Sequence, residues 1–170
     1  RHDGGKVFLT VSAKTDAPID TRVTLIAPSG ERSTLECGKE AEVNSPELWW
    51  PRGLGEQPLY TVVTEIISGG KVADSVTKTI GLRTLKLIRE KDKWGESFTH
   101  ECNGLKFFAM GADYIPEDNI FSRCTRERSY TLLKRCADAN FNAIRVWGGG
   151  AFETEHFYDE CSRLGIMVTQ

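Results

Sequence analysis

The fold is decided by residues 60–80, YTVVTEIISGGKVADSVTKTI. Apolar or β-branched side chains stand at alternate positions from Tyr60 to Ile66, which is the period of a strand with one buried face. The pair Gly69-Gly70 follows, and two glycines between such runs are a signal for a tight hairpin turn. We therefore expect residues 72–80 to pair back onto the first strand.

The same alternation continues upstream of this hairpin. It is carried by Val7, Leu9, Val11, Val23 and Leu25. A Pro-Ser-Gly turn signal follows at residues 28–30. Several short strands, with no helical period over residues 6–80, predict an immunoglobulin-like β-sandwich over residues 1–85. The Cys-Trp-Cys framework of antibody domains is absent, so the expectation concerns the architecture alone.

After Gly81 the hydrophobic period changes. We expect, in order, a strand over 107–112, a helix over 125–139, a strand over 142–147, a helix over 155–164 and a strand over 166–168. Thr125 is a favourable N-cap residue, and Asn140 and Gly165 suit the left-handed conformation that ends a helix. Strands that alternate with helices predict a parallel sheet with right-handed crossovers.

The parallel part is too short for a complete barrel. A closed (β/α)₈ barrel needs roughly 250 residues, so residues 86–170 would supply about three of its strands. The sequence therefore predicts a truncated α/β segment of the TIM-barrel type, either a small open sheet or a piece of a longer protein. The chain stops at Gln170 with no helix to cover its last strand, which favours a cut chain whose open sheet edge self-associates. Before the parallel part, residues 94–97 and Asn103-Gly104 are typical of turns.

The composition excludes several classes of protein. With 39% hydrophobic and 27% charged residues, the chain has the make-up of a folded domain and not of a disordered one. A net charge of −2 and a pI near 6.0 provide no field that would capture nucleic acid or an anionic membrane, so we expect neither partner. The five cysteines have no CxxC spacing and the three histidines stand apart. We expect reduced thiols in a cytoplasmic protein and no metal site.

The densest motif is residues 142–150, NAIRVWGGG. A strand there delivers Arg145 and Trp147 to its carboxyl end, where α/β folds build their sites, and the glycines allow close approaches. In the structural alternative, Arg145 pairs with a carboxylate of a neighbouring strand, Trp147 joins the core and the glycines form a turn. A phosphate cradle is a third interpretation, but neither GxGxxG nor GxxxxGK[ST] surrounds these glycines.

Two further stretches permit a functional and a structural interpretation. Residues 113–118, DYIPED, follow the first parallel strand, and paired carboxylates there could act as acid and base in glycoside hydrolysis. A loop that caps the next segment is the structural alternative. The aromatic pair Trp49-Trp50 lies beside a turn, where it would either stack on a sugar or pack against a neighbouring domain.

Together these motifs resemble family-two glycoside hydrolases. Residues 48–60, LWWPRGLGEQPLY, followed by residues 81–84, GLRT, are similar to the passage from sandwich to barrel in that family. The stretches similar to its β-mannosidase branch are residues 103–104, 111–116, 145–150 with 152–153, and 157–161 with 164–166. The resemblance covers nearly all of the chain from residue 45 onward.

The resemblance implies a retaining exo-β-mannosidase that removes terminal β-D-mannose residues from oligosaccharides without a metal or an organic cofactor. In that family, the arginine at the Arg145 position lies beside the catalytic nucleophile and would hold it ionised. The tryptophan at the Trp147 position lines the sugar site, and Asp113, Tyr114 and Gly149 are implied as further substrate-binding residues. Galactosidases and glucuronidases of the family carry Ser-His-x-Pro after that arginine, which favours the mannosidase branch for this chain.

The chain also departs from the family pattern. Asp113-Tyr114 stands where the family usually has Asn-Trp, and Thr169 stands where it usually has Trp. In the family a jelly-roll domain precedes the sandwich, and both catalytic glutamates lie beyond Gln170. The resemblance therefore implies no catalytic residue within this chain, which alone is predicted to be inactive. The alternatives are a complete, non-catalytic carbohydrate-binding or scaffold protein, and a family-two hydrolase of other sugar specificity.

Overall fold

A computed structural model describes residues 1–3, 5–14 and 19–170. Its contacts divide the chain into two compact units. The first consists of Arg1–Glu47 and Pro58–Leu82, and the second of Leu48–Gln57 and Arg83–Gln170. These units differ from the expected division into residues 1–85 and 86–170 in the place of the segment 48–57. As a statement about domains, that division stays a prediction.

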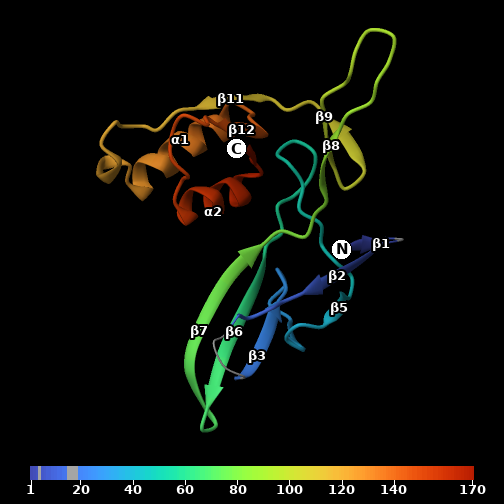
Figure 1. Cartoon of the computed structure of the whole chain (residues 1–170), viewed down its shortest axis with the longest axis vertical. Helices are drawn as coiled ribbons and strands as arrows, with labels where there is room; N and C mark the ends of the chain where they lie inside the picture. The colour runs from blue at the N-terminus through green and yellow to red at the C-terminus, as the bar shows by residue number, and fades with distance from the viewer. Residues whose placement is uncertain (4, 15–18) are drawn as a thin grey trace. The chain divides into compact units, whose positions relative to one another are not determined.

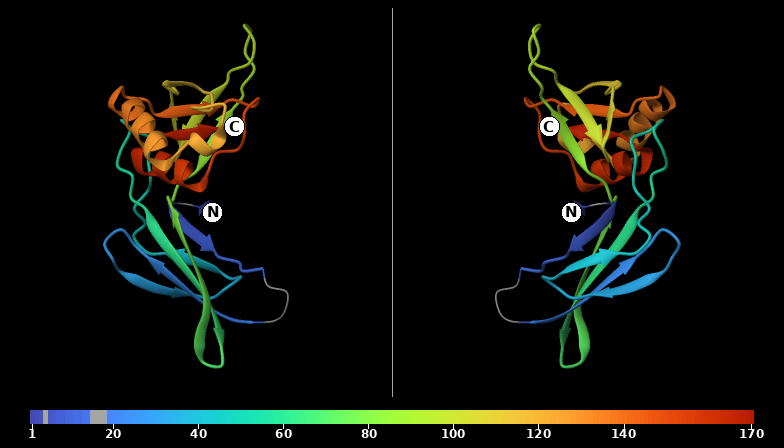
Figure 2. Two further views of the ribbon diagram at one scale, coloured as in Figure 1. Left: turned by 90° about the vertical axis from the view of Figure 1, so that its left-hand side faces the viewer. Right: turned by 90° about the vertical axis from the view of Figure 1, so that its right-hand side faces the viewer.

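The first unit is a β-sandwich of two antiparallel sheets (Figures 1 and 2). One sheet has the order β1 (His2–Asp3), β2 (Lys6–Thr10), β5 (Glu40–Val43); the other has the order β4 (Arg32–Leu35), β3 (Asp20–Ile26), β6 (Tyr60–Ser68), β7 (Lys71–Ile80). Side chains from both sheets form the core, namely Val7, Val23, Leu25, Val43, Tyr60 and Val62. The predicted sandwich is confirmed; its immunoglobulin-like topology stays a prediction.

The hairpin predicted at Gly69-Gly70 is present. Strands β6 and β7 pair antiparallel up to the partners Ser68 and Lys71, which leaves a two-residue loop. Both loop residues have positive φ, 58° for Gly69 and 75° for Gly70, as a type I′ turn requires. No helix occurs between residues 6 and 80 in the part of that range which the structure describes, as expected.

The second unit contains an antiparallel sheet that the sequence did not indicate. It consists of β8 (Leu85–Ile88), β9 (Thr99–Cys102) and β10 (Leu105–Phe107) in the order β10-β9-β8. Asn103 and Gly104, with φ of 50° and 84°, form the predicted turn and fold β10 back onto β9. The expectation of a parallel strand starting at residue 107 is therefore wrong, because this turn commits Phe107 to the antiparallel sheet and the parallel strand starts at Gly111.

The parallel sheet follows as predicted. Its strands are β11 (Gly111–Tyr114), β12 (Ala143–Val146) and β13 (Met167–Thr169), in that order, and they are connected through η1 (Phe121–Arg123), α1 (Arg126–Asp138) and α2 (Glu155–Leu164). Thr125 caps α1 by accepting a hydrogen bond from the Arg128 N–H, and Gly165 ends α2 with φ of 75°. The predicted helices are confirmed, and membership of the three strands in a barrel stays a prediction.

One face of this sheet is covered by the helices (Figure 1). The shared core contains Tyr114, Ile144 and Val146 from the strands, and Leu133, Ala137, Phe157 and Cys161 from the helices. Because side chains alternate along a strand, the residues between these positions project from the opposite face. On that opposite face Arg145 is exposed, whereas Ala143 and Met167 are buried.

The segment 48–57 packs within the second unit. The Trp49 side chain is buried, and its indole N–H donates to the carbonyl of Ser162 at 2.7 Å. The Arg83 guanidinium lies 4.4 Å from the centre of the Trp49 ring, and burial lowers the pKa of Arg83. Further along, the Arg52 N–H donates to the carbonyl of Gly165 at 2.8 Å. The burial of Trp49 therefore disfavours a sugar-binding platform, and its packing lies within the second unit and not against a neighbouring domain.

The cysteines of the described residues are all free thiols. Cys102 and Cys161 are buried, while Cys37, Cys124 and Cys136 are partly exposed. Burial raises the pKa of Cys102 to about 11 and that of Cys161 to about 12. These two thiols stay protonated at neutral pH and are packing groups.

Candidate functional site

The candidate site lies at the carboxyl ends of β11, β12 and β13. Asp113 is the register partner of Arg145, and Arg145 is the register partner of Thr169. The neighbours Tyr114 and Val146 are buried against the helices, so alternation places the row Asp113–Arg145–Thr169 on the helix-free face. Three strands thus bring a carboxylate, a guanidinium and a hydroxyl into one line.

Asp113 and Arg145 form an ion pair in this row. The Arg145 Nη1 donates to the Asp113 Oδ1 at 2.8 Å, with side chains 59% and 55% exposed respectively. Pairing of Arg145 with a neighbouring strand was the structural alternative, and this contact is present. Exposed ion pairs contribute little to the free energy of folding, typically about 0.2–1 kcal/mol. A gain in stability alone therefore does not explain why two charged residues stand on this face.

Trp147 follows β12 directly and stands at the same edge. The backbone N–H of Trp147 donates to the carbonyl of Tyr114 at 2.9 Å. The backbone carbonyl of Trp147 accepts from the Gly150 N–H at 3.1 Å, which closes a turn. The indole is not in the core, because 44% of the residue is exposed. Gly149 lies against the far end of the indole ring. Arg145 and Trp147 are two residues apart, so both belong to the helix-free side of the strand.

Tyr114, in contrast, lies in the core. Only 5% of it is exposed, and its ring centre lies 4.9 Å from that of Phe157. Its hydroxyl is close to the Glu153 carboxyl but not in hydrogen-bonding geometry, and burial is the main cause of its raised pKa. A substrate-binding role for Tyr114 stays a prediction, one that its burial does not favour.

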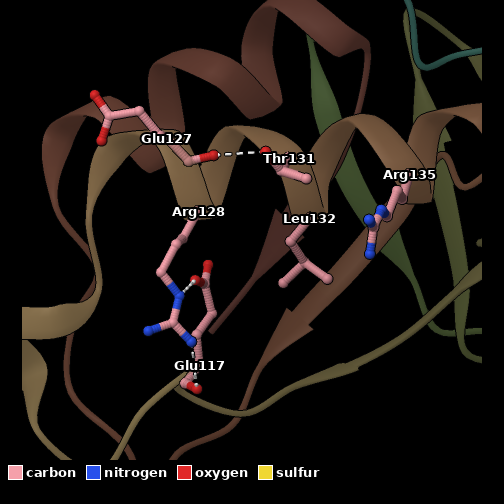
Figure 3. Close-up of a pocket in the computed structure, with 6 residues that line it drawn as sticks. All are labelled: Glu117, Glu127, Arg128, Thr131, Leu132 and Arg135. Atoms are coloured by element: carbon pink, nitrogen blue, oxygen red, sulfur yellow. Dashed lines mark hydrogen bonds and ion pairs between the residues drawn. The ribbon is translucent and has the colours of Figure 1, made fainter.

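The acidic residues of the loop after β11 are engaged with α1. Arg128 lies 3.5 Å from the Glu117 Oε2 and 3.4 Å from the Asp118 Oδ2, and Figure 3 shows its guanidinium directed at Glu117. The Asp118 Oδ1 also accepts from the Ile120 N–H at 2.9 Å. These contacts favour the interpretation of this loop as a cap for the next segment over that of an acid–base pair.

An open cleft adjoins this contact. It is lined by Glu117, Glu127, Arg128, Thr131, Leu132 and Arg135, all on α1 except Glu117 (Figure 3). Neither Arg145 nor Trp147 lines it, so it is separate from the row of polar residues on the helix-free face.

The sequence analysis missed the structural role of Asn142 and the environment of Glu153. Asn142 is buried; its Oδ1 accepts from the Met110 N–H at 2.7 Å and its Nδ2 donates to the Phe108 carbonyl at 3.1 Å. It thereby ties the chain before β11 to the start of β12. The pKa of Glu153 is raised by burial and by the neighbouring Glu117 carboxylate. A polar residue directly before a buried strand was the available signal for Asn142; nothing local marked Glu153.

Neither a metal centre nor a membrane span is found in the described part of the chain. No group of three or more His, Cys, Asp or Glu side chains there is arranged to hold a metal ion. No helix of the described residues is long and apolar enough to cross a membrane.

The sandwich belongs to a class of protein that comparison with known families identifies. Residues 4–83 match the family described as glycosyl hydrolases family 2. Among curated proteins, the chain is 41% identical over 130 residues to beta-mannosidase B of Thermothelomyces thermophilus, and 39% identical over 129 residues to beta-mannosidase B of Emericella nidulans. The chain carries a domain of glycosyl hydrolases family 2 at residues 4–83, and its resemblance to the β-mannosidases of that family is confirmed.

Solved structures agree with this assignment. A β-D-mannosidase from Dictyoglomus thermophilum is 35% identical with a TM-score of 0.75, over 87% of this chain and 20% of that one. An exo-chitosanase from Amycolatopsis orientalis, 23% identical with a TM-score of 0.66 over 88% of this chain and 18% of that one, shares the fold. The two curated relatives are matched over 75% and 76% of this chain, which spans 15% of the length of each.

Proposed function

We propose that this chain is a segment of a retaining exo-β-mannosidase, in which a sandwich precedes the first three parallel strands of a catalytic (β/α)₈ barrel. The observation that carries the proposal is the exposed row of Asp113 and Arg145, with Trp147 beside it, at the carboxyl ends of parallel strands. Barrel enzymes place their active sites at that end. The similarity to β-mannosidases supplies the substrate class.

In this proposal the reaction uses two glutamates outside the chain. One protonates the glycosidic oxygen, the other attacks the anomeric carbon, and in retaining enzymes their carboxyl groups stand about 5–5.5 Å apart. No metal or organic cofactor takes part. Arg145 supports the nucleophile, since a guanidinium close to a carboxylate lowers its pKa and keeps it ionised at neutral pH.

The geometry of Arg145 suits that role. Its guanidinium carries five N–H donors, of which the contact with the Asp113 Oδ1 uses one. Asp113 therefore fixes the guanidinium at the sheet while other donors remain for the nucleophile. The Asp113 carboxylate is itself more than half exposed, so it can also accept a sugar hydroxyl.

Trp147 supplies the apolar face of the proposed sugar site. Sugars pack their C–H faces on aromatic rings, and the exposed indole beside the Asp113–Arg145 pair combines such a face with polar groups. Gly149, at the ring, completes the set of proposed substrate-binding residues.

The proposal is tested by hydrolysis of aryl β-mannosides. A full-length protein that carries this chain should cleave the β-mannoside in preference to the matching β-galactoside and β-glucuronide, with retention at the anomeric carbon, while the chain alone should show no turnover. Trp147→Ala should weaken substrate binding by about 1–3 kcal/mol, as truncation of large aromatic residues in binding sites does. Turnover by the purified chain that is lost on mutation of Glu117 or Asp118 would contradict the proposal, and sugar binding without hydrolysis by the full-length protein would favour the carbohydrate-binding alternative.

We also propose that the chain, when isolated, associates through its parallel sheet. Strands β11 and β13 each pair with β12 alone among the described strands, which leaves backbone N–H and C=O groups along both outer sides. Unpaired strand edges pair readily with other chains. Sedimentation should show dimers or larger species that grow with concentration; a strictly monomeric profile at high concentration would refute this.

A further inference from the structure

The loop after β12 contains Gly148, Gly149 and Gly150, and only one of them faces the indole of Trp147. A Cβ atom built on Gly149 would lie 2.6 Å from Cζ3 of that indole and closer still to Cη2 and Cζ2. Carbon atoms in contact are ordinarily about 3.5–4.0 Å apart. The present ring position therefore exists because residue 149 has no side chain.

The other two glycines differ in their surroundings. A Cβ on Gly148 would meet no atom within 4 Å, and one on Gly150 would meet the Pro116 ring at 3.0 Å. None of the three has φ in the left-handed region, so alanine is compatible with the backbone at each position. Gly148 and Gly149 are thus neighbours that both tolerate alanine in the backbone, but only a side chain at 149 would collide with the indole.

We propose that Gly149 is a positioning residue, whose role is to seat the Trp147 indole beside the Asp113–Arg145 pair. In this role Gly149 contributes to the proposed sugar site through the ring. The positioning itself follows from the geometry alone; its consequence for sugar binding rests on the proposed function.

The same geometry separates positioning from a contribution to stability. The atoms that a Cβ on Gly149 would displace are the far end of a side chain that is 44% exposed, and such a ring can rotate into solvent. Gly111 is the contrasting case, because a Cβ there would collide with the backbone carbonyl of Ala143 in the adjacent strand. Gly149→Ala should therefore move the indole and leave the fold intact, whereas Gly111→Ala should strain the parallel sheet.

The first experiment observes the ring directly in this chain. The four tryptophans are labelled with 5-fluorotryptophan, and the ¹⁹F resonance of Trp147 is assigned by its loss in Trp147→Phe. Gly149→Ala should shift that resonance and increase its solvent isotope effect, while Gly148→Ala should leave it in place. The melting temperature of both variants should stay within about 2 °C of the unmodified chain, while that of Gly111→Ala should fall by more.

Two results of this first experiment would overturn the inference. One is a Trp147 resonance that responds equally to alanine at 148 and at 149. The other is a Gly149→Ala variant that unfolds as early as Gly111→Ala, since the glycine would then serve the fold.

The second experiment uses the full-length protein that carries this chain. Gly149→Ala should raise KM for an aryl β-mannoside about tenfold, with a smaller change in kcat, and Gly148→Ala should not. In a Trp147→Ala background, Gly149→Ala should have no further effect, because there is no ring to displace. If the resonance shifts while KM is unchanged, the positioning stands and the sugar-binding role of Trp147 in the proposed function fails. A further loss in the Trp147→Ala background would instead overturn the inference.

Discussion

The Asp113–Arg145 pair should contribute little to the stability of the fold, and this can be measured with a double-mutant cycle of Asp113→Ala and Arg145→Ala. Two unit charges 2.8 Å apart attract by about 1.5 kcal/mol in bulk water. Ordering two half-exposed side chains and screening by salt reduce that value, so we expect a coupling free energy of about 0.2–1 kcal/mol.

Urea unfolding of the four proteins, followed by circular dichroism at low and high salt, gives this coupling. The Arg128–Glu117 contact is the comparison within the same unit. The Glu117 side chain is only 9% exposed and its Oε1 has no hydrogen-bond partner in the described chain, so removal of Arg128 leaves a nearly buried carboxylate without its cation. We expect a loss of about 1–3 kcal/mol for Arg128→Ala, larger than for either member of the exposed pair.

A coupling above about 2 kcal/mol between Asp113 and Arg145 that persists at high salt would refute this reasoning. The pair would then be a structural link between β11 and β12, and the argument that its charges are kept for a ligand would lose its basis. A weak, salt-sensitive coupling would leave function as the reason for two charges on this face.

Three further outcomes follow from single side chains of the second unit. Asn142→Ala should lower the free energy of unfolding by about 2–3 kcal/mol, because two buried hydrogen bonds disappear. Asn142→Asp should be at least as destabilising near neutral pH, and its stability should recover in acid. Equal stability of the unmodified chain and both variants would show that water replaces the amide. Trp49→Phe should lower the free energy of unfolding, measured with urea, by about 1–3 kcal/mol, because it leaves the Ser162 carbonyl without its donor. An unchanged free energy would mean that this hydrogen bond does not hold the segment 48–57 in place. The pKa of Glu153 is raised in the folded state, so its ionisation opposes folding as the pH rises above the ordinary value of 4.5. Glu153→Gln should therefore gain stability relative to the unmodified chain as the pH rises above that value. Parallel curves of stability against pH for the two proteins would contradict the shift.

Where local chemistry determines local structure, the sequence was sufficient. The loop Gly69-Gly70 has the two positive φ angles that its hairpin needs, and glycine adopts them without strain. Helix α1 follows the Thr125 N-cap and ends before Asn140, whose φ is 62°. In each case the signal lies within a few residues of the feature that it predicts.

Contacts between distant segments were not predictable in this way. The indole of Trp49 binds a carbonyl 113 positions away, and no periodicity in either segment encodes that contact. Strand β10 joined the antiparallel sheet because a strong turn at Asn103 returned it to β9, although its apolar run continued toward β11. Tyr114 is a residue type that is common in binding sites, but the alternation of side chains along β11 places it against the helices.

Parity explains why this short motif combines a core with a site. In β12, Ile144 and Val146 are buried beneath the helices, which commits Arg145 to the opposite face, and the same step places Trp147 there. A slip of the register by one residue would bury the guanidinium and expose two aliphatic side chains, so the hydrophobic core specifies the orientation of the polar row. Gly149 acts at the next level, because the backbone sets the side from which Trp147 projects and the missing side chain sets where its ring rests. Core packing and site geometry are therefore determined by the same few positions, and this is why substitutions that leave the core intact, Arg145→Ala and Gly149→Ala, separate function from stability.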